Sequence, residues 1–165
     1  MIYPTATDML KNIDATLAAK VVPSLAGLDE QSAVATIRHL LRLVLVRTEE
    51  EGQLLLDEID RLRTLLPQVR DYLRSIGEDE QIDAALTAAT DDGRYPSLDL
   101  LSARLAGLRE ALYQALKTLQ GLRGEQGEEP NYRAGRAAIR AYVVWQNEQE
   151  RKLIAPAFYG RGPRR

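Results

Sequence analysis

One apolar stripe runs through the longest proline-free segment of the chain, from Ala33 to Leu66. Its members follow one another at spacings of three and four residues, which is the period of one face of an α-helix. The stripe comprises Ala33, Ile37, Leu40, Val44, Thr48, Glu51, Leu55, Ile59, Leu62 and Leu66. We expect one long helix that buries this stripe, with a polar break at Thr48 and Glu51. The other segments must then pack around it.

A first, shorter helix precedes this segment. Thr5 or Thr7 can cap it, and its apolar positions recur at helical spacing as far as Val21. Pro23 ends it, and Asp29 is placed to cap the long helix. So short a connection predicts that the first two helices pack antiparallel.

Further helices follow the long one. Pro67 is expected to kink or restart it, and a short helix is expected to open at residues 78–80. Ser97 caps a leucine-rich helix, and glycines between Gly121 and Gly127 indicate a flexible linker. The last helix begins at Asn131 or Tyr132 and ends before residue 156. The sequence therefore predicts an all-α protein, an up-and-down four-helix bundle with a short helical insertion after the long second helix. We expect a single domain over residues 1–160 and a disordered basic tail at 161–165.

Composition excludes several classes of function. With 22 basic and 24 acidic residues the net charge is −2, which does not favour binding to nucleic acid. The absence of cysteine excludes disulfides, thiolate catalysis and cysteine-ligated metals. The longest dense apolar run, residues 40–46, is too short to span a bilayer. We expect a cytoplasmic protein that does not insert into membranes.

Motifs for catalysis are absent from the sequence. The chain has one histidine, His39, so it cannot supply the two Glu-x-x-His pairs of a ferritin-like di-iron site. A carboxylate-only Mg²⁺ or Mn²⁺ site remains conceivable, although a solvated acidic turn explains Glu49, Glu50 and Glu51 more simply. There is no nucleophile elbow, P-loop or dinucleotide fingerprint. We therefore predict no catalytic residues, no metal and no cofactor.

A polar layer between the second and last helices is the one candidate for a ligand site. The polar break of the long stripe has a counterpart in the polar second half of the last helix. The candidate ligand-binding residues are His39, Arg42, Thr48, Glu51, Gln146 and Glu150. A structural hydrogen-bond network, or a position at an exposed end, explains the same residues more simply.

The first third of the chain resembles a family of small, uncharacterised, all-helical bacterial proteins. The resemblance rests on Tyr3-Pro4-Thr5-Ala6, on Leu10, Ile13 and Leu17, and on the run from Val21 to Gly27. The second helix departs from the family pattern, with Gln31 and Ser32 where an aromatic residue and histidine are usual. Members are encoded near acyl-CoA dehydrogenases and phosphotransferases that resemble aminoglycoside kinases. The resemblance implies a link to acyl-CoA metabolism and carries over no catalytic residue.

Two hypotheses for function follow. The first is a non-enzymatic accessory protein that binds a protein partner or forms a homodimer, and it predicts an exposed apolar patch. The second is a small-molecule binder or cryptic enzyme that uses the polar layer, and it predicts an enclosed pocket between the second and last helices. The sequence identifies neither the protein partner of the first hypothesis nor the small molecule of the second.

Overall fold

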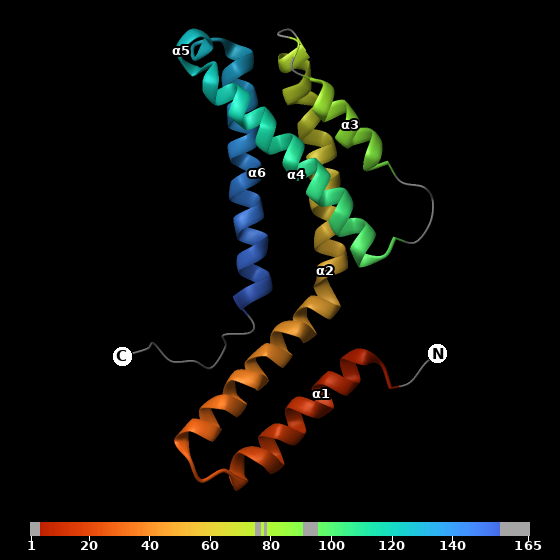
Figure 1. Ribbon diagram of the computed structural model, residues 1–165, viewed down its shortest axis with the longest axis vertical. Helices are drawn as coiled ribbons and strands as arrows, with labels where there is room; N and C mark the ends of the chain where they lie inside the picture. The colour runs from red at the N-terminus through yellow and green to blue at the C-terminus, as the bar shows by residue number, and fades with distance from the viewer. Residues whose placement is uncertain (1–3, 75–76, 78, 91–95, 156–165) are drawn as a thin grey trace. The chain divides into compact units, whose positions relative to one another are not determined.

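A computed structural model describes residues 4–74, 77, 79–90 and 96–155. Within these ranges the chain forms six α-helices and no β-strand, so the prediction of an all-α helical bundle is confirmed. The helices are α1 (Ala6–Thr16), α2 (Leu28–Arg74), α3 (Glu80–Ala88), α4 (Leu98–Gly121), α5 (Arg123–Gln126) and α6 (Pro130–Ile154) (Figure 1).

The chain divides into two compact units. The first unit comprises residues 1–51 and 149–165, and the second comprises residues 52–148. The division falls between Glu51 and Gly52 in α2, directly after the polar break in the long stripe. The single domain expected over residues 1–160 stays a prediction, and the tail expected at 161–165 lies outside the described residues.

The first unit contains a helical hairpin of α1 and the N-terminal half of α2. Thr5 caps α1 as expected: its hydroxyl accepts a hydrogen bond from the backbone N–H of Asp8, and the Asp8 carboxylate accepts one from the N–H of Thr5. α1 ends earlier than predicted, at Thr16, and the chain continues as a π-helical turn (Leu17–Val21) and a 3₁₀ turn (Val22–Ser24). These turns reverse the chain, so α1 runs alongside α2 (Figure 1).

α2 is longer than the sequence predicts. It begins at Leu28, so Asp29 lies in its first turn rather than at the cap, and it ends at Arg74. Pro67 lies inside the helix, so of the two alternatives expected there, a kink or a restart, the restart is wrong and the kink stays a prediction. Proline removes one backbone hydrogen bond. The flanking Leu66 and Val69 are fully buried, and this packing holds the helix together around the proline.

The second unit holds the hydrophobic core. α2 contributes residues between Ile59 and Leu73, and α4 contributes an equal number from one leucine-and-alanine face. α3 adds Ile82, and α6 adds Tyr132, Ile139 and Tyr142. α1 contributes no residue to this cluster, whereas the short α3, predicted only as an insertion, does.

The ends of α4 and α6 follow from local sequence. Ser97 caps α4 as predicted, because its hydroxyl accepts the N–H of Leu100. The expected flexible linker after α4 instead contains the single helical turn α5. α6 starts at Pro130, one residue before the predicted start, where a missing N–H costs no helical hydrogen bond. No described helix is long and apolar enough to cross a membrane.

The prediction that the whole long stripe is buried is wrong for its first half. Ile59, Leu62 and Leu66 lie in the core, but Ala33, Ile37, Leu40 and Val44 are exposed. The physical reason is that the helices covering the second half belong to the second unit. In the first unit α1 packs on a different face of α2, as the following contacts establish.

Candidate functional site

Ion pairs define how α1 lies against α2 in the first unit. The Asp14 carboxylate accepts hydrogen bonds from Nε and Nη2 of Arg38, at 2.7 and 3.4 Å, and Nε of Arg42 lies 3.5 Å from it. Near the other end of the hairpin, Nζ of Lys11 donates to Glu49 at 3.1 Å. The hydrogen bonds from Arg38 hold the pKa of the Asp14 carboxyl below its usual value. These contacts fix the antiparallel register, because the earlier residue of α1 meets the later residue of α2.

The same register places the apolar residues of both helices on one side of the hairpin. Ile13 directly precedes Asp14, and Ile37 directly precedes Arg38. In an antiparallel pair, the residue before each contacting residue is turned by about 100° toward the same side. Met9 lies one turn from Ile13, while Leu40 and Val44 continue the stripe of Ile37. We call these five residues, Met9, Ile13, Ile37, Leu40 and Val44, the hairpin face.

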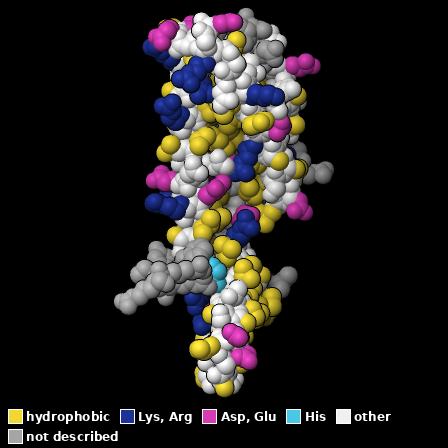
Figure 2. Space-filling view, turned by 60° about the vertical axis from the view of Figure 1, so that its left-hand side comes forward, with side chains coloured by type: hydrophobic (Ala, Val, Ile, Leu, Met, Phe, Trp, Pro, Cys, Tyr) yellow, Lys and Arg dark blue, Asp and Glu magenta, His cyan; other side chains and the backbone are white. Residues whose placement is uncertain are grey.

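The hairpin face is exposed. Each of its five side chains keeps between 48% and 54% of its surface accessible, and hydrophobic side chains on the surface of the hairpin are visible in Figure 2. Covering the exposed half of five such side chains would contribute about 4–8 kcal/mol before the costs of association. Contiguous apolar surface of this kind marks interaction sites in globular proteins.

The hairpin also lacks a core of its own. None of the described residues of α1 is buried, and the buried residues of α2 begin only at Glu58, in the second unit. Helices obtain most of their stability from packing of an apolar face. The contact between α1 and α2 therefore leaves one apolar face of the hairpin without a packing partner.

The six ligand-site residues predicted from the sequence are distributed over both units. Arg42 pairs with Asp14, and Glu51 lies 3.6 Å from Arg47 one turn earlier. Thr48 is exposed, and its hydroxyl donates to the carbonyl of Val44. His39 and Gln146 are half-buried, Glu150 is exposed, and each of these three makes an interaction.

Of the six, Gln146 alone belongs to the second unit. The contacts of Arg42, Thr48 and Glu51 lie within the first unit, so these three have structural partners there. A ligand site that uses all six stays a prediction. Among the described residues, no three histidine, aspartate or glutamate side chains gather into a group that could hold a metal ion.

A buried polar cluster in the second unit was not found from the sequence. Glu58 is only 8% exposed, and its carboxylate accepts hydrogen bonds from Nε and Nη2 of Arg109 at 2.7 and 2.8 Å. The hydroxyl of Tyr142 donates to the same carboxylate at 2.5 Å. Burial and the negative charge of Glu58 raise the pKa of Tyr142. The cluster ties α2, α4 and α6 together at one level of the bundle.

One sequence signal could have revealed this cluster. Leu55, Glu58, Leu62 and Leu65 recur at helical spacing, so a charged residue occupies a core-facing position of α2. A carboxylate at such a position requires partners, because an unpaired buried charge is costly. Beside the cluster, the guanidinium of Arg61 lies 4.8 Å above the ring of Trp145, which is a cation–π contact.

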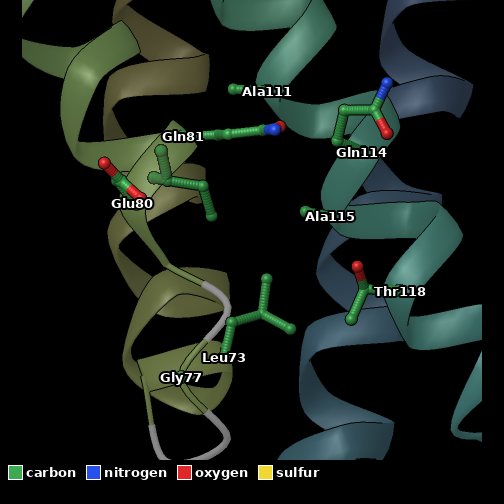
Figure 3. Close-up of a pocket in the computed structure, with 9 residues that line it drawn as sticks. Leu73, Gly77, Glu80, Gln81, Ala111, Gln114, Ala115 and Thr118 are labelled. Carbon is green, nitrogen blue, oxygen red and sulfur yellow. The ribbon is translucent and has the colours of Figure 1, made fainter.

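One pocket of the second unit is lined mainly by apolar and uncharged polar side chains. The pocket in Figure 3, about 200 Å³ in volume, opens between α3 and α4. The residues that line it include Leu73 of α2, Ala111 and Ala115 of α4, and the polar residues Gln81, Gln114 and Thr118. Among the described residues that line this pocket, Glu80 is the one that carries a charge, so they offer no acid–base or nucleophile–base pair.

The hairpin face is thus our candidate functional site, because it is apolar and exposed and because ion pairs fix the register of the two helices that form it. Comparison with protein-family models, with curated proteins and with solved structures finds no match to this chain.

Proposed function

We propose that this chain is a cytoplasmic, non-enzymatic accessory protein that binds a protein partner through the hairpin face. The observation that carries the proposal is the exposure of Met9, Ile13, Ile37, Leu40 and Val44 on one side of a hairpin that buries no residue. A partner that covers this face would give the hairpin the apolar packing that it lacks.

The arrangement of charges supports binding by apolar contact. Along α2 the stripe positions from Ala33 to Thr48 carry no charge. Of the charged residues of α1, Asp8 is held by the hydrogen bonds of the Thr5 cap, and Lys11 and Asp14 are paired with residues of α2. A helical partner with its own apolar stripe fits such a surface, as in helix-in-groove recognition.

The resemblance of the first third of the chain suggests which partners to test first. Proteins of the family that it resembles are encoded near acyl-CoA dehydrogenases and kinase-like phosphotransferases. On this ground we propose a role linked to acyl-CoA metabolism. In this role the chain binds a protein partner and does not itself catalyse a reaction.

Site-specific photo-crosslinking in living cells tests the proposal. A photoreactive phenylalanine analogue is placed at Leu40, and a matched control carries it at Tyr113, which is 60% exposed on α4 in the second unit. We expect a discrete protein adduct from position 40 that Ile37→Glu abolishes, and none from position 113. No adduct at position 40, or the same adducts from both positions, would refute binding through this face.

A further inference from the structure

We propose that the partner of the hairpin face is a second copy of this chain, so that two hairpins pack face to face as an intermolecular four-helix bundle. This inference rests on the proposed function, and it names the partner. The observation behind it is the position of two residue pairs. Asp14 and Arg38 join the two helices of the hairpin, and the preceding residues, Ile13 and Ile37, are both exposed on the same side of it.

The hairpin is half of a four-helix bundle. Two antiparallel helices with one apolar side form a single layer, and a second such layer completes a two-layer core. An identical hairpin supplies that layer through a twofold axis, because an isologous interface uses the same patch on both copies.

The charges of the face suit a copy of itself. Stripe positions from Ala33 to Thr48 are uncharged, so two copies meet without like-charge repulsion across the centre of the interface. Lys11 and Asp14 are neutralised within their own hairpin by Glu49 and Arg38. A partner selected by charge would require unpaired charged groups on the face, and the positions that form it carry none.

The size of the face sets the strength of the dimer. From Ala33 to Val44 the stripe is about 17 Å long, and two helices side by side are about 20 Å wide. The resulting footprint is smaller than the roughly 800 Å² per partner of a standard interface. We therefore expect a dimer that forms reversibly with concentration rather than an obligate one.

Sedimentation equilibrium of the purified full chain, from low micromolar to millimolar concentration, tests this inference. We expect the apparent mass to rise from 18.4 kDa toward twice that value as concentration increases. Leu40→Glu should hold the chain at the monomer mass. The matched control Val144→Glu changes an apolar residue that is 61% exposed on α6 in the second unit, and it should leave the association unchanged.

A milder substitution separates loss of association from loss of folding. Leu40→Ala keeps the helix and removes apolar contact, so we expect far-ultraviolet circular dichroism to be unchanged and the dimer dissociation constant to rise at least about tenfold. A chain that stays monomeric at every concentration would overturn the inference. So would a dimer that Val144→Glu disrupts and Leu40→Glu does not.

The two proposals fail in different ways. A purified chain that remains monomeric, together with a specific adduct to a different protein at position 40, would overturn the homodimer and leave binding through the hairpin face intact. An adduct with the mass of two chains, joined through position 40, supports both. Absence of any adduct together with a monomeric chain refutes both.

Discussion

Glu58 on α2 and Arg109 on α4 form a two-point ion pair whose carboxylate also accepts the hydroxyl of Tyr142 on α6. Three helices of the second unit therefore share one buried acceptor, and a change at Glu58 affects each of them.

Replacing Glu58 with alanine should destabilise the second unit. The substitution leaves the hydroxyl of Tyr142 without its acceptor and removes the anion that pairs with Arg109. The Arg109 side chain is 43% exposed, so water compensates part of its loss, and we expect a cost of about 2–3 kcal/mol in the free energy of unfolding. Urea denaturation followed by circular dichroism measures it. Glu110→Ala, an exposed change one residue from Arg109, is the control and should cost less than about 0.5 kcal/mol; equal effects would contradict a special role for Glu58.

From the raised pKa of Tyr142 we predict how the free energy of unfolding changes at alkaline pH. Its pKa in the folded state is raised above the usual value of 10.0, so the folded chain keeps the phenol protonated after the unfolded chain has begun to lose the proton. The contribution of Tyr142 to stability is therefore fully present below pH 10 and decreases as pH rises above it. The difference in unfolding free energy between the wild type and Tyr142→Phe, measured from pH 8 upward, should be constant to about pH 10 and then shrink. A difference that grows above pH 10 would contradict the sign of the shift.

From the lowered pKa of Asp14 we predict that the hairpin loses stability as the pH falls into the acidic range. Its pKa is lowered from 3.8 by the hydrogen bonds from Arg38, so its stabilising effect is present above pH 3.8 and is lost as pH falls through the folded value. Asp14→Asn should therefore reduce protection of α1 amides from hydrogen exchange at neutral pH, by an amount equivalent to about 0.5–1 kcal/mol. The difference from wild type should vanish at strongly acidic pH. A variant that stays less protected even there would indicate a packing defect instead of a lost ion pair.

The fold class could be predicted from the sequence because helical periodicity and caps are local signals. Thr5 and Ser97 cap helices as their side chains and positions suggest, and leucines that recur at helical spacing in α4, such as Leu101, Leu105 and Leu108, are buried on one face. Leu98 lies at the same spacing, three residues before Leu101, and is half exposed in the structure. Periodicity states which residues share a face, and it does not state how far along the helix a covering partner extends.

The same limit explains the long stripe and the missed cluster. Ile37 and Ile59 belong to one sequence pattern, yet only Ile59 is covered, because coverage depends on contacts between distant segments. Glu58 meets Arg109 and Tyr142 across 51 and 84 residues, and no local spacing connects them. Asp14 and Arg38 likewise fix the hairpin register through a contact that becomes apparent only when the two helices are placed together.

Gly52 supplies the last prediction, since it is the first residue of the second unit and lies inside a helix. A methyl group at this position would lie 3.6 Å from Cδ2 of Leu98, which is an ordinary van der Waals contact. Gly52→Ala should therefore raise the free energy of unfolding by about 0.5–1 kcal/mol, through reduced backbone entropy in the unfolded chain.

Two other glycines calibrate the measurement. Gly107→Ala, on an exposed face of α4 with no atom near the added methyl group, should stabilise by helix propensity alone. Gly77→Ala should destabilise, because Gly77 has a φ of +77° that side chains disfavour. Thermal unfolding of the three variants gives the order directly. If Gly52→Ala destabilised the chain as Gly77→Ala does, the prediction would be contradicted. Gly52 would then need a backbone conformation that side chains disfavour, and the regular helix at this position shows none.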